Sequence, residues 1–211
     1  MTKDSSVRLS FHCCVFMIYS MSFLYDFIAM DSWDYSYMGR LKFATFWNGL
    51  LHVLYSAVCV VVDIQDRMVA ACPSQGSVRR LQCARDTFHT AIIFPFGTFC
   101  VLSFWGLYFK DRELVYPQRL DSDLTCSIIF IIKHSLTFIF TLCDKILVHH
   151  RYPPFLTGIC VSECFPLFYC IWVYPFMRYL DIPARFMVIL FGFVPIAIFH
   201  VIGKYITSFI W

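Results

Sequence analysis

The sequence predicts an all-α integral membrane protein, a bundle of about six transmembrane helices. Of its 211 residues, 59% are hydrophobic and only 15% are charged. A soluble domain of this size cannot present such a composition to water. The apolar residues are also gathered into runs close to the roughly 20 residues that a helix needs to cross the hydrocarbon core of a bilayer. Little of the chain is left over for a soluble domain.

Apolar runs of spanning length follow one another along the chain, and we assign them to a single membrane domain, residues 1–211. The first run is too long for a signal peptide and lacks a small-residue cleavage site. The fourth carries Lys133 and His134, but its many Ile, Leu and Phe residues offset the roughly 3 kcal/mol cost of a central lysine. The fifth is weakened by Glu163 and Pro166. The predicted spans are residues 9–29, 43–62, 88–109, 124–143, 155–174 and 186–206.

A polar stretch, residues 65–86, separates the second and third spans and contains Pro73, Gly76 and several arginines. This composition is typical of a loop in water. Because basic loops favour the cytoplasmic side, we expect this loop and both termini there, in the endoplasmic reticulum or plasma membrane. The basic residues form no long stripe, which argues against nucleic acid as a partner. The expected partners are membrane lipids, and the sequence does not predict an oligomeric state.

The chain has 11 cysteines, most of them inside apolar runs, where they are interpreted as packing residues. There is no CxxC pair, and Cys160 and Cys164, one helical turn apart, would make a weak metal site. The pair His149 and His150, with Glu163, superficially resembles part of a di-iron centre. Such centres need several histidine clusters, so this alternative is disfavoured. The sequence therefore predicts neither a metal nor a cofactor.

Polar side chains form a stripe on each of two predicted membrane helices. In the second, Thr45, Asn48 and His52 lie at i, i+3 and i+7, and therefore project from one face. In the fourth, His134 and Thr141 are seven residues apart and share a face, with Thr137 and Ser127 on the same side. Polar and ionisable groups within membrane helices are costly and usually face the bundle interior. Both stripes are therefore candidate site residues.

If the stripes face each other, the Thr45 hydroxyl and the His134 imidazole share a cavity. A nucleophile beside a base is the minimum equipment for acyl transfer, and hence for ester hydrolysis. There is an ordinary structural alternative, because membrane threonines usually bond their own helix and membrane histidines often only pack. Counted from the preceding loops, the two residues also differ in depth by about 9 Å. The candidates for lining the site or binding an oxyanion are Asn48, His52 and Lys133, and those for a substrate carboxylate are Lys42, Arg85 and Arg112.

Several ordered blocks then resemble the androgen-induced gene 1 family: GRLKFATFWNGL, ARDTFHTAIIFPFGTF, FWGLYFKDRELVYPQRLD, the His134 helix, and WVYPF with IGKYITSFIW. The resemblance covers residues 39–152 and 172–211. It implies a multi-pass threonine hydrolase that cleaves fatty acid esters of hydroxy fatty acids, with Thr45 as nucleophile and His134 as base. Between these regions the chain is shorter than the family pattern, which predicts a short fifth helix. The alternative is a non-catalytic membrane scaffold of the same family that binds lipid or regulates a partner.

Overall fold

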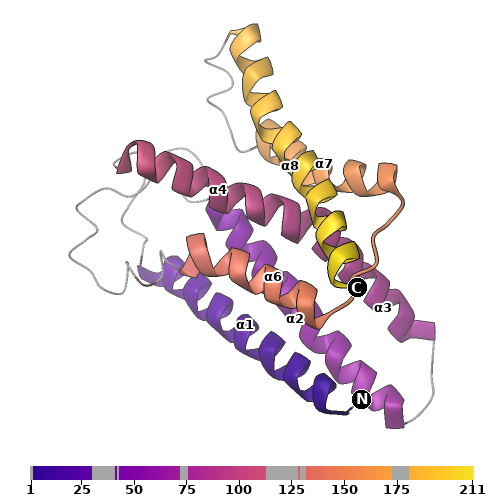
Figure 1. Ribbon diagram of the computed structural model, residues 1–211. Helices are drawn as coiled ribbons and strands as arrows, with labels where there is room; N and C mark the ends of the chain where they lie inside the picture. The colour runs from indigo at the N-terminus through magenta and orange to yellow at the C-terminus, as the bar shows by residue number, and fades with distance from the viewer. Residues whose placement is uncertain are drawn as a thin grey trace.

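The computed structural model describes residues 2–29, 41, 43–71, 76–112, 128, 132–172 and 181–211. The secondary structure of these residues is helical, and Figure 1 shows the helices packed side by side as a bundle. The all-α prediction is confirmed. The elements are α1 (Thr2–Ala29), α2 (Ala44–Ala71), α3 (Gly76–Phe88), η2 (His89–Ile93), α4 (Phe94–Lys110), η5 (Ile132–Leu136), α6 (Thr137–Leu147), α7 (Phe155–Trp172) and α8 (Ile182–Ile210).

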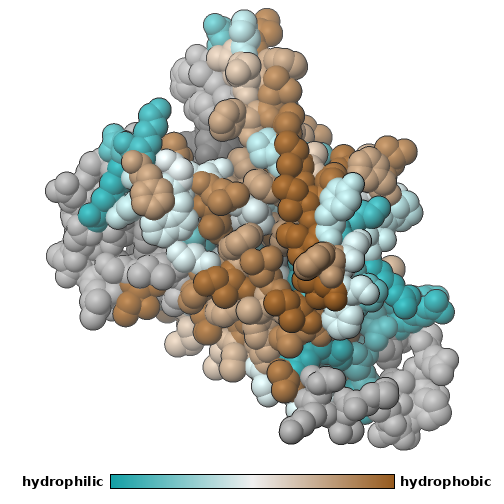
Figure 2. All heavy atoms as spheres, viewed as in Figure 1, coloured by the Kyte–Doolittle hydropathy of each residue, from teal (hydrophilic) through white to brown (hydrophobic). Residues whose placement is uncertain are grey.

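Several helices have the length and composition of membrane spans. Among the described residues, four qualify, and a shorter apolar helix covers Phe155–Phe168. Large apolar side chains such as Met21, Leu102 and Phe191 point outward, more than half exposed, as expected of a surface in contact with lipid. Figure 2 shows hydrophobic residues along α8 and over the middle of the visible face, with hydrophilic residues gathered near α3. The four spans are Ser5–Tyr25, Ala44–Met68, Arg79–Lys110 and Leu190–Ile210.

The predicted loop at residues 65–86 is wrong over most of its length, because α2 continues to Ala71 and α3 begins at Gly76. The polar side chains that suggested a loop instead join three helices. Asp66 accepts hydrogen bonds from Arg8 at 2.8 Å and from Gln82 at 2.7 Å. α2 and α3 therefore continue through this polar stretch, because its polar side chains are paired with one another.

The fifth helical segment, α7, has 18 residues, Phe155–Trp172. At 1.5 Å per residue it is about 27 Å long, close to the roughly 30 Å hydrocarbon core. It packs tightly on α8, because Gly158 lets the His200 ring approach to within 2.6 Å of the place a Cβ would occupy. α8 starts earlier than predicted, at Ile182, where the Asp181 carboxylate caps it by accepting a hydrogen bond from the Ala184 amide at 2.8 Å.

Two wide helical turns, η2 and η5, interrupt otherwise α-helical segments. η2 lies just before Pro95, which has no amide hydrogen to complete the preceding α turn, and a π turn relieves the clash of its ring. At η5 the His134 carbonyl accepts a hydrogen bond from the Trp105 indole at 2.8 Å. Turns of this kind often occur at functional sites. Here each one carries a buried histidine, His89 in η2 and His134 in η5.

Both ends of the chain lie at one end of the bundle (Figure 1). The Trp211 indole donates to the Lys145 carbonyl at 3.0 Å and stacks on His149 with ring centroids 5.3 Å apart. Arg8, near the start of α1, pairs with Asp63 of α2 at 2.6 Å. This arrangement fits an even number of membrane crossings.

Candidate functional site

The two polar stripes predicted from the sequence face each other across the bundle interior. The His52 Nε2 of α2 lies 3.4 Å from the Thr141 hydroxyl of α6. Tyr19 of α1 joins both helices, because its hydroxyl donates to the Thr137 hydroxyl at 2.9 Å and its ring lies 5.0 Å from that of His52. These side chains are buried. With Asn48 they form a surface between three helices that we call the polar seam: Tyr19, Asn48, His52, Thr137 and Thr141.

The neighbours of Gly97 in α4 show how deep Thr45 and His134 lie in the bundle relative to each other. A Cβ on Gly97 would lie 3.4 Å from the Asn48 side-chain oxygen and 3.7 Å from a Thr137 methyl, so Asn48 and Thr137 share one level of the bundle. The His52 to Thr141 contact, four residues further along each helix, shows that α2 and α6 run in the same direction. Thr45 and His134 each precede that level by three residues. They therefore lie at similar depth, and the offset of about 9 Å counted from loop ends does not apply.

His134 is enclosed by aromatic side chains. Its imidazole lies 3.8 Å from the Phe104 ring, centroid to centroid, and only 7% of the residue is exposed. Thr45, on the first turn of α2, is half-buried. The preceding residue, Ala44, packs against the core cluster that contains Phe96 and Cys100 of α4. The surroundings of Thr45 and His134 are therefore apolar, with the polar seam on one side.

The other predicted residues divide between the two ends of the bundle. Asn48 is buried, and its side-chain oxygen has no hydrogen-bond partner among the described residues. Lys133 is half-buried in η5, next to His134. Arg112 lies beyond the end of α4, with its guanidinium 5.8 Å from the Tyr108 ring, on the Phe104 side of the bundle. Lys42 lies outside the described residues.

Arg85 is placed elsewhere. Its guanidinium is buried and donates to the Asp86 carboxylate at 2.7 Å. Asp86 in turn contacts His150, whose other ring nitrogen contacts Asp144. Because Asp144 is ten residues after His134 on the same helical segment, Arg85 belongs to the opposite end of the bundle. The structure does not bring it to Thr45.

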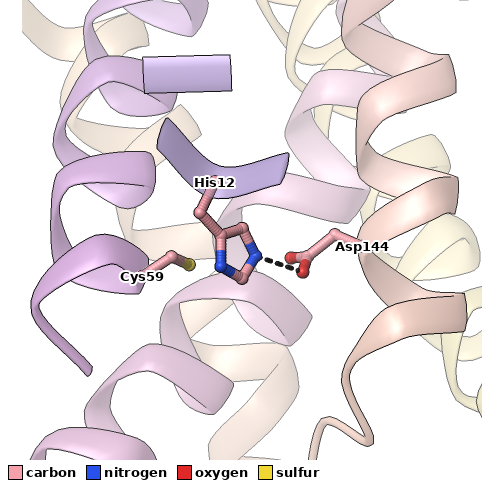
Figure 3. Close-up of side chains that lie close together, drawn as sticks. All are labelled: His12, Cys59 and Asp144. Atoms are coloured by element: carbon pink, nitrogen blue, oxygen red, sulfur yellow. Dashed lines mark hydrogen bonds and ion pairs between the residues drawn. The ribbon is translucent and has the colours of Figure 1, made fainter. Parts of the chain in front are cut away.

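That opposite end holds a second buried polar group that the sequence analysis missed. Asp144 is its centre, 2% exposed. One carboxylate oxygen lies 2.9 Å from His12 Nε2 (Figure 3), and the other contacts the Tyr55 hydroxyl and His150 Nε2. His89 Nε2 lies 3.6 Å from this second oxygen. We call this group the histidine–aspartate cluster: His12, Asp63, Asp86, His89, Asp144 and His150.

Further carboxylates surround these histidines. The Asp63 carboxylate lies 2.5 Å from His12 Nδ1, and the Asp86 carboxylate lies 3.2 Å from His150 Nδ1. Each of these carboxylates is paired with an arginine: Asp63 with Arg8 at 2.6 Å, and Asp86 with Arg85 at 2.7 Å. Such networks are stable in an apolar interior only when their charges are paired and hydrogen-bonded. Each histidine with two carboxylate neighbours is thereby fixed in orientation.

A signal for this cluster was present in the sequence. The predicted second and fourth spans ended at residues 62 and 143, which left Asp63 and Asp144 one position outside them. Asp144 nevertheless follows Thr141 by three residues, so it continues the same helical face. Asp63 similarly follows His52 by eleven residues, or three helical turns. His89 has no such signal, because its partners come from distant parts of the chain.

A cavity of about 780 Å³ opens beside the histidine–aspartate cluster. It lies between the ends of α1, α2 and α3 and the segment that follows α6. Asp86 lines it, and so does His149, the neighbour of His150. Its walls carry several basic groups. The lining residues are Arg8, Asp66, Arg79, Gln82, Cys83, Arg85, Asp86, Val148, His149 and Arg151.

Comparison with known proteins identifies the family. The family profile described as FAR-17a/AIG1-like protein matches residues 7–208, nearly the whole chain. The chain belongs to the FAR-17a/AIG1-like family. Within that family, it is 30% identical over 203 residues to the androgen-induced gene 1 protein of Homo sapiens, an alignment that covers 89% of this chain and 84% of that protein.

Other relatives in the FAR-17a/AIG1-like family are more distant. The androgen-dependent TFPI-regulating proteins of Mus musculus and Homo sapiens are 28% and 27% identical, each over 82% of this chain and over 78% and 77% of their own length. No solved structure matches the chain. The family assignment therefore rests on sequence, and it confirms the resemblance of the ordered blocks.

Proposed function

We propose that this protein is a transmembrane threonine hydrolase that cleaves fatty acid esters of hydroxy fatty acids, with Thr45 as nucleophile and His134 as base. The observation that carries the proposal is the common level of Asn48 and Thr137 against Gly97. It gives the threonine and the histidine, each three residues earlier, a similar depth on neighbouring helices. Membership of the FAR-17a/AIG1-like family supports the same assignment.

The proposed reaction has two halves. In the first, the Thr45 oxygen attacks the ester carbonyl carbon while its proton passes to His134. The tetrahedral intermediate collapses, the bond to the alcohol oxygen breaks, and His134 protonates the departing hydroxy fatty acid. In the second, a water molecule attacks the threonyl ester and gives a proton to His134, which returns it to the Thr45 oxygen as the fatty acid leaves.

Neighbouring groups have roles in this scheme. The Asn48 side-chain NH2 group is a candidate donor to the developing oxyanion, because Asn48 is buried in the polar seam at the level of Thr137. Lys133 is adjacent to His134 and is a second candidate donor, while His52 lines the seam. Arg112, at the same end as His134, is the preferred candidate for the substrate's free carboxylate. Lys42 stays a candidate for that role, and both termini are proposed to face the cytoplasm.

The test is hydrolysis of a branched fatty acid ester by purified protein in detergent or nanodiscs. Thr45→Ala should lower the rate by at least about 10³-fold, because the nucleophile is lost. His134→Gln should lower it by about 10²- to 10⁴-fold, the usual contribution of a general base. Thr90→Ala is the matched control, since Thr90 is buried and its hydroxyl bonds the Asp86 carbonyl of its own helix. Full activity in Thr45→Ala would end the nucleophile assignment.

A second candidate function is a non-catalytic scaffold that binds lipid or regulates a partner. It is favoured by the name of several relatives, the androgen-dependent TFPI-regulating proteins. A fluorophosphonate probe separates the two functions. Labelling that disappears in Thr45→Ala supports the hydrolase, whereas a folded protein that is neither labelled nor active supports the scaffold.

A further inference from the structure

We infer that His89, Asp144 and His150 form a binding site for a divalent transition metal, with zinc as the ion that fits best. The site lies in the histidine–aspartate cluster and uses none of the residues assigned to ester hydrolysis. Along the helix, Asp144 is ten residues from His134, which corresponds to about 15 Å. The proposal therefore stands independently of the proposed hydrolase.

The distances among the three side chains suit one ion. His150 Nε2 lies 3.2 Å from Asp144 Oδ2, and His89 Nε2 lies 3.6 Å from the same oxygen. All three ligand atoms lie within 4.8 Å of one another. A tetrahedral zinc ion with ligands near 2.0–2.1 Å holds neighbouring ligand atoms about 3.3 Å apart. Because an imidazole binds a metal in its own ring plane and the two rings are stacked with planes 7° apart, one ring must turn out of the stack to close the three ligands around such an ion.

Hydrogen bonds among the described residues do not account for the burial of the His89 imidazole. It is fully buried, and neither of its ring nitrogens has a hydrogen-bond partner of good geometry among the described residues, although the ring lies near the backbone of Thr141. Burying an imidazole in this way is costly. Its ring stacks on that of His150, with centroids 3.9 Å apart and planes 7° apart, and its Nε2 faces Asp144. A metal ion held jointly with His150 and Asp144 would satisfy that nitrogen.

The surrounding side chains provide the outer support that metal ligands usually have. His150 Nδ1 lies 3.2 Å from the Asp86 carboxylate, so the ring can donate there and keep Nε2 free for an ion. A neutral imidazole has a single N–H and cannot donate to Asp86 and Asp144 together. Asp144 is held through its other oxygen by His12 at 2.9 Å. His150 and Asp144 are therefore both oriented before any ion binds.

A second group of potential ligands shares Asp144 but is a poorer site. Figure 3 shows Cys59 and His12 beside Asp144, drawn from α2, α1 and α6. Both nitrogens of His12 already face carboxylates, Asp63 at 2.5 Å and Asp144 at 2.9 Å. His150 is placed similarly, between Asp86 and Asp144, so the two groups differ in His89, whose ring nitrogens have no hydrogen-bond partner of good geometry among the described residues. The unsatisfied histidine lies on the other side of Asp144, and we place the ion there.

The ligand set indicates which ion binds. Two imidazole nitrogens and one carboxylate oxygen form a set used by zinc, with one coordination position left for water or another oxygen ligand. Iron(II) uses the same set in an octahedral geometry, which brings neighbouring ligands closer, to about 3.0 Å. The separations of 3.2 and 3.6 Å lie nearer to the tetrahedral value. The adjacent cavity reaches Asp86, the residue that contacts His150.

Elemental analysis of the intact purified protein tests the site. After dialysis against zinc and then against metal-free buffer, the wild type should retain about one equivalent of zinc per chain. His89→Gln should retain less than about a fifth of that amount. His200→Gln is the matched control, because His200 is equally buried, lies on α8, and bonds the Thr90 carbonyl at 3.0 Å. Equal zinc in the two variants, or stoichiometric iron in the wild type, would overturn the assignment.

A second measurement on the wild type keeps the test independent of how the variants fold. Cobalt(II) replacing zinc at a tetrahedral site of this type should give strong visible absorption between about 500 and 650 nm, which added zinc should abolish. Chelation should lower the thermal unfolding temperature of the wild type but not of His89→Gln. A protein that binds no zinc and gives no cobalt spectrum would show that the cluster is held together by hydrogen bonds and protons alone.

Discussion

Replacing Gly203 by alanine should destabilise the bundle where α8 meets α4 and the segment after α6. A Cβ at this position would lie 2.6 Å from a Phe94 ring carbon and 2.7 Å from the Tyr152 hydroxyl. Neither neighbour can retreat easily. Phe94 is 1% exposed and lies under the Lys145 ammonium, which also donates to the Tyr152 hydroxyl at 2.8 Å.

The size of the effect follows from a comparison within one helix. Gly192 also lies in α8, and a Cβ there would meet nothing within 4 Å. Gly192→Ala should therefore gain about 1 kcal/mol of helix propensity, as should Gly203→Ala before its clash is counted. Overpacking costs about 1–3 kcal/mol. The propensity gain cancels between the two variants, so Gly203→Ala should be about 1–3 kcal/mol less stable than Gly192→Ala.

Thermal unfolding in detergent, followed by near-ultraviolet circular dichroism, measures this difference. For a chain of this size, 1 kcal/mol corresponds to roughly 2–4 °C in Tm, so the two variants should differ by roughly 2–12 °C. Equal Tm values, or a higher value for Gly203→Ala, would mean that α8 does not approach Phe94 as closely as described.

Two more substitutions examine the site and the cluster. Gly97→Val should lower the rate of ester hydrolysis by about 10²-fold, because the added methyl groups push into His52, which lies only 3.3 Å from the Cβ position. Gly106→Val is the control on the same helix and should stay active, because a Cβ there meets nothing within 4 Å. If both variants keep full activity, the seam does not position the reacting groups. Asp144→Asn should lower the free energy of unfolding by about 3–5 kcal/mol, because it unbalances a buried charge network. Asp181→Asn should leave the Tm unchanged, because Asp181 is an exposed helix cap and asparagine caps equally well. Similar melting of these two variants would show that Asp144 is not the centre of a charged network.

Hydropathy and helical spacing were enough to predict the membrane bundle and the two polar stripes, whereas the structure shows that the stripes face each other. The apolar runs correspond to helices because the bilayer imposes their length and backbone hydrogen bonding. The spacing placed His52 and Thr141 on the polar faces of their helices, and these two side chains make contact in the structure. Where polar residues repeat with the period of a helix, the sequence indicates which face of that helix packs into the bundle.

Helix ends and depths could not be predicted in the same way. A polar residue ends an apolar run, but here Asp63 and Asp66 continue α2, because His12 and Arg8 of α1 pair with them. Such pairs join residues more than fifty positions apart and have no local signature. The depth of Thr45 was misjudged for a related reason, since loop ends were assumed to lie level with one another. His89 gains meaning only from Asp144 and His150, which lie far along the chain.

The wide turns η2 and η5 affect how a protein of this kind can gain or lose residues during evolution. A π turn contains one residue more than the α turn it replaces. Losing one residue from such a turn would restore a regular α turn and leave both flanking helices intact and facing nearly the same way, because the wide turn and the α turn cover almost the same rotation. A single codon deletion could thus exchange the buried histidine for its neighbour without unfolding a membrane helix. Length variation at these two turns is therefore a route by which related proteins could acquire different interior chemistry on the same scaffold.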